Sequence, residues 1–242
     1  MPGAHRQAAG LLPIGAHGYA GEMDQDDLAA LLAAARDTRF DLHDEAALRA
    51  VYPNRPQPAS QVKVVDHVHP LYRPFIEAAP FVVLCTQGPR GLDASPRGDA
   101  PGFVRIVDER TLLLPDRRGN NRLDSLGNLL TDPRLALMFL VPGCNEALRV
   151  NGTGRISTSA VLCEALTVQD KRPASVIVVE VASVYFQCAR ALMRSRLWEP
   201  DARIDRATLP SIGTILGELS RHAIDGAAYD AELPARQRST LY

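Results

Sequence analysis

Lysine is almost absent from this chain of 242 residues: of its 27 basic residues, only Lys63 and Lys171 are lysine. Genomic codon bias explains this scarcity most simply, but it also means that any anion site must be built from arginine. The planar guanidinium of arginine binds phosphate or carboxylate through two parallel hydrogen bonds. The formal net charge of -1 argues against a dominant electrostatic attraction to nucleic acid or to a membrane surface.

Closely spaced cysteines and long apolar runs are also lacking. The four cysteines stand far apart in the sequence, which disfavours a zinc site or a redox-active dithiol. Reduced cysteines in the cytoplasm are therefore the default expectation. No apolar run approaches the roughly 20 residues of a membrane helix. Residues 1–21 lack a continuous apolar core, so we expect a loose arm there and not a signal peptide.

Motifs for metal and nucleotide binding are missing as well. The six histidines are scattered, and His67 and His69 are two residues apart, which does not suit a shared metal site on a helix. We therefore expect no metal. The sequence contains no glycine-rich Walker loop ending in Gly-Lys-Ser or Gly-Lys-Thr, so a phosphate site of that type is excluded.

Helical patterns occupy both ends of the sequence. Residues 24–40 begin with acids and continue with alanine and leucine, and residues 43–52 predict a second, shorter helix. A proline-rich linker follows at 54–60. Near the other end of the chain, residues 189–200 and 209–224 again predict helices.

Short β-type runs dominate the middle of the sequence. Turns rich in Gly, Pro and Asp separate them. The strand candidates are 81–86, 92–95, 103–108, 111–115, 134–141, 146–158 and 174–188. Most strand pairs lack a crossover helix, which disfavours a parallel sheet. The pattern predicts a mainly β (α+β) fold with a closed or nearly closed antiparallel barrel. We place an N-terminal arm with helices at 1–60, the barrel at 61–188 and a C-terminal helical extension at 189–242.

A basic loop precedes one of the two short helices expected between the strands. The strand before it ends at Pro115, and Asn121 is a plausible N-cap with Arg122 in the first turn. Free N–H groups and the positive end of the helix dipole, together with arginine, would bind phosphate or carboxylate. The alternative is a solvated loop, in which Arg117 and Arg118 are plain loop charges. Four leucines are expected on one face of this helix: Leu123, Leu126, Leu129 and Leu130.

Two further segments carry arginine in unusual settings. Residues 93–103 are dense in turn-forming residues and contain Arg97, and on their own they predict a β-turn connection. Arg190, Arg194 and Trp198 are four residues apart, which predicts that they share a helical face. That face is either a partly exposed amphipathic surface, or a guanidinium and an indole presented to a flat or anionic ligand.

These three segments, in this order, carry a family resemblance. Residues 93–157 resemble the pyridoxamine 5'-phosphate oxidase-like, FMN-binding split-barrel family, and residues 185–198 look like the signature of a bacterial FMN-binding subgroup. The resemblance covers roughly residues 45–220. It implies a six-stranded split antiparallel β-barrel that works as a homodimer, with two FMN sites at the subunit interface.

The resemblance also implies where FMN would be bound. In the family, a loop and the start of a helix hold the FMN phosphate through a serine followed by two basic residues. This chain has Asn120, Asn121 and Arg122 there, so only Arg122 matches as a cation and the two asparagines would donate amide hydrogen bonds. Pro115 and Asp116 fall where family members line the isoalloxazine edge.

Three more cofactor-binding residues follow from the same resemblance. Arg97 falls on a strand end that approaches the flavin, and it is the candidate for a guanidinium near the N1–C2 edge of the ring. Arg194 and Trp198 fall in a tail that can reach the flavin of the other subunit. No catalytic base is identified, and none is required if the substrate delivers a hydride.

One family element has no counterpart here. True pyridoxamine 5'-phosphate oxidases end with Arg-x-His and Arg-Leu-x-Pro elements, and their absence disfavours vitamin B6 oxidation. The implied function is a cytoplasmic FMN flavoprotein, an oxidoreductase that transfers hydride or electrons between FMN and a small substrate. Two alternatives stay open: a non-catalytic protein that binds or stores flavin or another cofactor, and a flavin-independent domain that binds an acidic metabolite.

Overall fold

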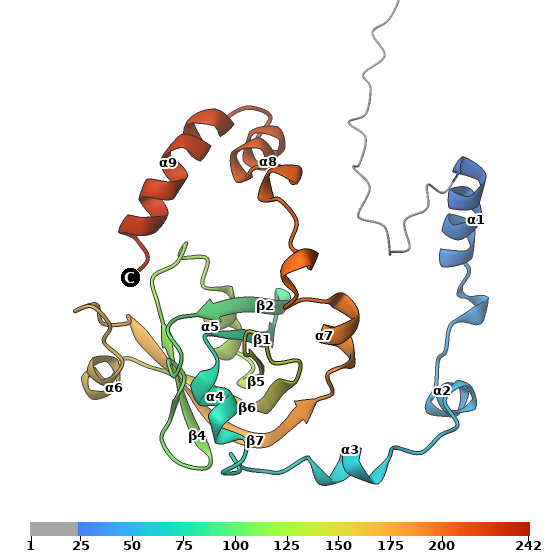
Figure 1. Ribbon diagram of the computed structural model, residues 1–242, viewed down its shortest axis with the longest axis horizontal. Coiled ribbons are helices and arrows are strands. Elements are labelled where there is room, and N and C mark those ends of the chain that lie inside the picture. Colours follow the sequence, from blue (N-terminus) through green and yellow to red (C-terminus); the bar gives the residue numbers. More distant parts are fainter. Residues whose placement is uncertain (1–23) are drawn as a thin grey trace, which may run out of the picture. The chain divides into compact units, whose positions relative to one another are not determined.

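The computed structural model describes residues 24–242 and is shown in Figure 1. The arm predicted for residues 1–21 lies outside the described residues. The chain divides into two compact units, of which the first ends at Pro56 and the second spans Gln57–Tyr242. The boundaries that the sequence suggested, after residues 60 and 188, stay predictions.

The described part of the first unit consists of short helices. These are α1 (Gln25–Ala35), the 3-10 helix η1 (Thr38–Phe40) and α2 (Glu45–Val51). The side chains of Asp24 and Asp44 cap α1 and α2 by accepting hydrogen bonds from backbone N–H groups of the first turn. Both predicted helices are confirmed, and none of their residues is buried within the described chain.

The second unit is built on one antiparallel sheet. Its strands follow the order β2-β1-β5-β6-β7-β4-β3, which leaves β2 and β3 as the edge strands. The strands are β1 (Phe81–Gly88), β2 (Gly91–Gly98), β3 (Arg105–Ile106), β4 (Thr111–Asp116), β5 (Arg134–Leu140), β6 (Ala147–Ser157) and β7 (Ser175–Gln187).

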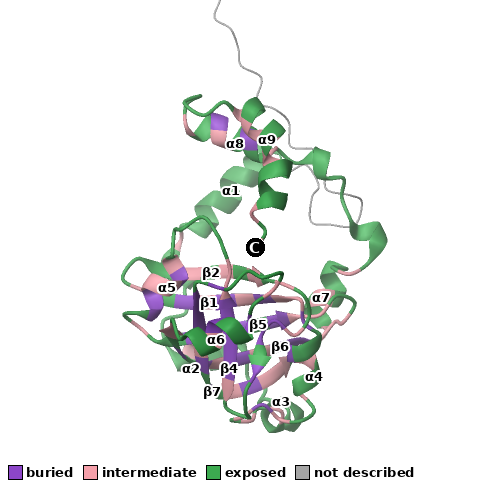
Figure 2. Cartoon of the chain, turned by 90° about the vertical axis from the view of Figure 1, so that its left-hand side faces the viewer, coloured by how far each residue is buried: buried purple, intermediate pink, exposed green. Residues whose placement is uncertain are grey.

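The sheet curls around a single main core. Val82 of β1, Leu114 of β4, Phe139 of β5 and Ile177 of β7 are fully buried and belong to one hydrophobic cluster. In a flat sheet β1 and β4 would lie about 19 Å apart, because four strand spacings separate them. Their shared core therefore requires an open, barrel-like curl, and Figure 2 shows the buried residues concentrated on the strands. The mainly β fold class is confirmed; the seventh strand is β3, which has two residues.

Helices of the second unit lie between strands and after the sheet. Those before and within the sheet are α3 (Pro58–Val62), α4 (Arg73–Ala78), α5 (Asp124–Leu129) and α6 (Ala160–Ala165). Those after it are α7 (Arg190–Ser195), the 3-10 helices η2 (Pro200–Ala202) and η3 (Arg206–Thr208), α8 (Ile212–Leu219) and α9 (Gly226–Ser239). The sequence predicted α5 to α8 but not α9, which contains Pro234 and few large apolar residues.

Strand β2 confirms the predicted strand at 92–95 and corrects part of the β-turn predicted at 93–103, since the turn itself is confined to residues 101–102. The strand continues through Pro96 to Gly98, paired with β1 along its whole length. Proline cannot donate a backbone hydrogen bond, but β2 is an edge strand, where this costs no inter-strand bond. Turn-forming composition was therefore a poor guide at the edge of the sheet.

Three structural features are absent from the described residues 24–242: a membrane-spanning helix, a cluster of metal ligands and a disulfide. None of their helices combines the length and the apolar character needed to cross a bilayer. Within the same residues, no group of three or more His, Cys, Asp and Glu side chains is placed to hold a metal ion. The thiols of all four cysteines, Cys85, Cys144, Cys163 and Cys188, are free.

Candidate functional site

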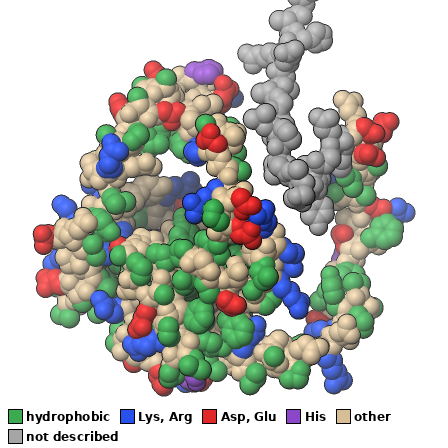
Figure 3. Space-filling model, in the orientation of Figure 1, with side chains coloured by type: hydrophobic (Ala, Val, Ile, Leu, Met, Phe, Trp, Pro, Cys, Tyr) green, Lys and Arg blue, Asp and Glu red, His purple; other side chains and the backbone are tan. Residues whose placement is uncertain are grey.

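A cleft of about 1190 Å³ opens between β2, the loop after β4 and the start of α5. Ligand sites typically have volumes of about 300–1,000 Å³, so the cleft is large enough for a cofactor with a substrate beside it. Figure 3 shows the surface hollowed beneath α9, with basic side chains at the margin of the hollow. Six residues predicted from the sequence line the cleft: Arg97, Pro115, Asp116, Asn120, Asn121 and Arg122.

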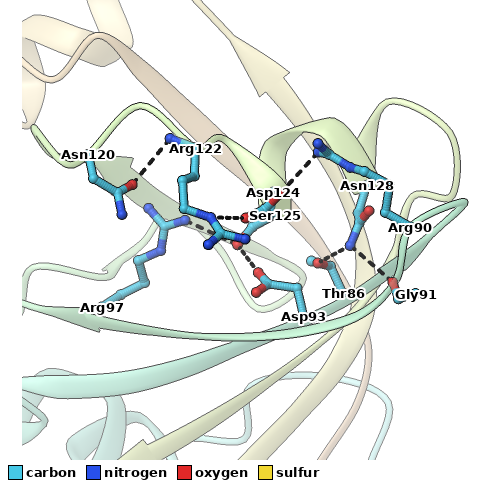
Figure 4. A network of polar contacts seen from close by, with 10 residues as sticks. All are labelled: Thr86, Arg90, Gly91, Asp93, Arg97, Asn120, Arg122, Asp124, Ser125 and Asn128. Carbon is cyan, nitrogen blue, oxygen red and sulfur yellow. Dashed lines mark hydrogen bonds and ion pairs between the residues drawn. The ribbon is translucent and has the colours of Figure 1, made fainter. Parts of the chain in front are cut away.

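The helix α5, whose first residues line the cleft, packs closely on the β1–β2 hairpin. Gly88 makes this approach possible, because a Cβ there would lie 2.2 Å from Asn128 Oδ1. The buried Asn128 amide donates to Thr86 Oγ1 at 3.2 Å and to the Gly91 carbonyl at 3.4 Å. These bonds fix α5 against the hairpin, as Figure 4 shows.

Arg97 connects three elements in the middle of the cleft. Its Nη1 donates to Asp116 Oδ1 of β4 at 2.6 Å, and its Nη2 donates to Ser125 Oγ of α5 at 3.3 Å. The two side chains of the ion pair are 19% and 15% exposed, so water screens the pair weakly. Arg97 Nε is buried and has no hydrogen-bond partner among the described residues. One N–H of a positioned guanidinium is thus left unsatisfied.

Asp93 and Ser125 complete this network, and neither was predicted from the sequence. Ser125 Oγ donates to Asp93 Oδ2 at 2.5 Å, and both residues line the cleft. Asp93 and Arg97 lie on one face of β2, because side chains two and four residues apart on a strand point to the same side. This period-2 pattern was the available signal. It was missed because the predicted strand ended at residue 95, and Arg97 was assigned to a turn.

Arg122 lies at the entrance to the cleft and contacts the next turn of the chain. Its Nε donates to Asp124 Oδ2 at 2.8 Å, and its backbone N–H donates to Asn120 Oδ1 at 3.2 Å. Arg90 pairs with the other oxygen of Asp124 at 3.2 Å. The Arg122 side chain is 75% exposed, so this ion pair is weak and can exchange its anion.

The start of α5 differs from the prediction. Asn121 is not the N-cap and Arg122 is not in the first turn, because the helix begins at Asp124. Asn121 and Leu123 have φ angles of 57° and 58°, so the chain passes through two left-handed residues before the helix. Asparagine tolerates this conformation better than most residues, which explains its place in the loop without any capping role.

The expected leucine face of α5 is also only partly right. Leu129 is buried and Leu126 packs against the main core. Leu123 and Leu130 are 56% and 78% exposed, because Leu123 precedes the helix and Leu130 follows it. Helical spacing was applied to residues that do not all belong to the helix.

Arg117 is not the plain loop charge that the sequence suggested. Its Nε pairs with Asp99 Oδ2 at 2.8 Å, with side-chain exposures of 16% for Arg117 and 1% for Asp99. Its Nη1 donates to the Leu166 carbonyl at 2.8 Å. Burial raises the pKa of Asp99, but hydrogen bonds from Tyr242, Ala100 N–H and Arg117 outweigh it and the pKa is lowered overall. Arg117 therefore belongs to a buried ion pair in the cleft wall.

Arg194 and Trp198 do not line this cleft within one chain. The helix α7 ends at Ser195, and Arg196 has a φ of 53°, so Trp198 does not share a helical face with Arg190 and Arg194 as predicted. Trp198 instead donates its indole N–H to the Cys144 carbonyl at 2.7 Å. Any contact of Arg194 and Trp198 with the flavin of a second subunit stays a prediction.

The charges that line the cleft favour an anion only slightly. The cleft residues include five arginines (Arg97, Arg117, Arg118, Arg122 and Arg172) and four aspartates (Asp93, Asp99, Asp116 and Asp124), a difference of one positive charge. Arg118 is exposed and has no ionic partner among the described residues. Guanidinium and amide donors in this number are chemically suited to a phosphate.

Comparisons with known proteins give one family. The model of the family described as pyridoxamine 5'-phosphate oxidase matches residues 68–188. No curated protein sequence matches the chain significantly. Solved structures that it resembles include HupZ of Group A Streptococcus, with 16% identity over 47% of this chain and 88% of that one, at a TM-score of 0.39.

Two further solved structures show a similar extent of likeness. General stress protein 26 of Bacillus anthracis is 12% identical over 47% of this chain and 88% of its own, with a TM-score of 0.36. An FMN-binding protein of Syntrophomonas wolfei is 13% identical over 48% of this chain and 88% of its own, with a TM-score of 0.37. In each case the likeness covers about half of this chain.

Replacing Asp99 by asparagine is expected to destabilise the protein by about 3 kcal/mol at pH 7, because it leaves the Arg117 charge buried without a partner. The lowered pKa of Asp99 adds a pH dependence. Its contribution is present above the ordinary value of 3.8 and is lost as the pH falls through the folded value. Urea unfolding of wild type and Asp99→Asn between pH 7 and pH ~3 measures this difference.

Asp201→Asn is the matched control for that experiment. Asp201 pairs with Arg196, but its side chain is 70% exposed, so a much smaller loss is expected. Equal losses in the two variants, or an Asp99→Asn effect that does not shrink in acid, would contradict the assignment.

Proposed function

This chain belongs to the pyridoxamine 5'-phosphate oxidase family, and on that premise we propose that it binds FMN in the cleft and acts as a homodimeric oxidoreductase on a small substrate. The observation that carries the proposal is the convergence of six predicted residues on one cleft that also holds an unsatisfied guanidinium N–H. A phosphate is the ligand that best satisfies such a set of donors.

The residues present fit the phosphate of FMN. Arg122 would be its cation, with Asn120 and Asn121 as amide donors from the same loop, which is the part of the cleft open to solvent. The exposed Arg122–Asp124 pair supports this assignment, because a doubly charged phosphate is a stronger partner than one carboxylate. The six-residue α5 has only a short dipole, so the side chains carry most of the binding.

The remaining residues would hold the ring end of FMN. Arg97 is the proposed guanidinium near the N1–C2 edge, fixed in place by Asp116 and Ser125. Pro115 and Asp116 would contact the ring edge through the main chain at the end of β4. Bound FMN would supply hydride or electron transfer, and the chain would supply orientation and electrostatics.

A second copy of the chain is the proposed partner. The outer face of the sheet carries an apolar pair in each of two neighbouring rows: Phe81 beside Leu140, and Val83 beside Met138. All four residues are partly exposed in one chain. A contiguous apolar patch on a sheet face is a typical interaction surface. Arg194 and Trp198 would then contribute to the FMN site of the partner subunit.

An oxidoreductase and a flavin-storage protein on the same barrel differ in one observable. The oxidoreductase would bleach the visible flavin band when a reduced donor such as NAD(P)H is added anaerobically, and the store would bind FMN without this change. The proposed substrate is a small molecule. Oxidation of vitamin B6 itself is not proposed, because the sequence lacks the Arg-x-His element.

Replacing Arg122 by alanine is expected to weaken FMN binding by about 10- to 150-fold, the loss of one charge-assisted hydrogen bond worth about 1.5–3 kcal/mol. Quenching of flavin fluorescence during titration measures the dissociation constant. Arg73→Ala is the control, because Arg73 forms a similar exposed ion pair with Glu77 on α4, outside the cleft. An affinity unchanged by Arg122→Ala would remove this residue from the site.

Placing a charge on the outer sheet face should separate the dimer. Val83→Glu places a carboxylate between Pro96 and Met138, its neighbours on the adjacent strands, and so buries an unpaired charge in the proposed interface. The sedimentation mass should therefore fall from two chains to one at micromolar concentration. Val161→Glu is the control, since Val161 is 76% exposed on α6, which packs over β4 and β7 and not over β1 and β5. A wild-type mass of one chain would count against the homodimer.

A further inference from the structure

A segment distant in the sequence closes one side of the cleft. After α9 ends at Ser239, Leu241 and Tyr242 line the cleft. The Tyr242 hydroxyl donates a hydrogen bond of 2.7 Å to Asp99 Oδ1, and the guanidinium carbon of Arg117 lies 5.7 Å from the centre of the Tyr242 ring. A single side chain therefore ties the end of α9 to the cleft wall through a hydrogen bond and a cation–π contact.

The two cleft residues that Tyr242 contacts, Asp99 and Arg117, are held in place by other hydrogen bonds. The side chain of Asp99 is almost completely buried, and its two oxygens also accept from Arg117 Nε and from the Ala100 N–H at 2.8 Å. Arg117 is held in turn by the Leu166 carbonyl. Asp99 and Arg117 thus stay in position without Tyr242, which adds one hydrogen bond that can open and close.

The helix α9, which precedes Tyr242, is packed less tightly than these two cleft residues. No residue of α9 is buried, and its main packing partner is α8. The two helices meet closely, because a Cβ on Gly213 would lie 2.0 Å from the Gly226 carbonyl oxygen. Asp230 of α9 also accepts from the Gly213 N–H at 2.8 Å and from the Ser211 hydroxyl. Contacts between α8 and α9 thus hold this hairpin together within the second unit, and Tyr242 joins it to the cleft.

We propose that Tyr242 is a latch that closes the cleft over bound FMN, so that FMN leaves only after the Asp99–Tyr242 hydrogen bond opens. This inference rests on the proposed function of the cleft. A tyrosine suits the role, because its ring packs against a flat ligand while its hydroxyl makes one directional bond. A hydrogen bond to a charged group shifts the balance between closed and open forms by about 10- to 150-fold, which permits reversible opening.

The rates of FMN release and binding test the latch in the full chain. Release is followed by the recovery of free-flavin fluorescence after dilution, and binding by stopped-flow quenching. Tyr242→Phe, which keeps the ring, and Tyr242→Ala should each release FMN at least about tenfold faster. Both variants should also bind FMN faster than wild type, because the open form is more populated, whereas damage to the site itself would slow binding.

Tyr229→Ala is the matched control on the same helix. The Tyr229 ring lies 4.3 Å from the Arg236 guanidinium and does not line the cleft, so both rates should stay at the wild-type values. FMN binding with rates that neither Tyr242 substitution changes would overturn the latch and leave the proposed function standing. A wild-type chain that binds no FMN would overturn both.

Discussion

The contact between Arg97 and Asp116 determines the shape of the cleft. It joins the edge strand β2 to β4, which lies near the opposite end of the strand order, and the same guanidinium reaches Ser125 at the start of α5. β2 and β4 are not neighbours in the sheet, so no backbone hydrogen bonds join them. The ion pair therefore links two strands that are otherwise not paired. Because the pair is mostly buried, it is screened weakly and constrains both side chains.

This constraint also explains why the cleft is nearly neutral. Arg97, Arg117 and Arg122 each have an aspartate partner, so the chain folds without uncompensated buried charge. The cleft that would receive a ligand phosphate is therefore not strongly positive. The phosphate would replace the carboxylate at the exposed pair of Arg122 and Asp124, and it would leave the two buried pairs as framework. The exposure of each side chain thus separates the arginines of the two buried pairs, Arg97 and Arg117, from Arg122, which can exchange its partner.

Alternation and helical spacing, which are local signals, predicted the fold class and most strands. The family resemblance, and not these patterns, predicted the six residues of the cleft. Prediction from the sequence failed where the role of a residue depends on a contact with a residue far away in the sequence. Arg117 was interpreted as a loop charge because its partner Asp99 lies 18 residues away. Tyr242 gave no signal at all, since its contact with Asp99 spans 143 residues. The edge position of β2, which makes Pro96 acceptable in a strand, is likewise visible only in the folded sheet.

The most direct test of an FMN site in this cleft compares FMN with riboflavin, which has the same ring but no phosphate. Equilibrium dialysis of the purified chain against each flavin measures both affinity and stoichiometry. The arginine and asparagine donors of the loop predict saturation at about one FMN per chain and at least about tenfold weaker binding of riboflavin. Equal affinity for the two flavins, or retention of neither, would contradict the account.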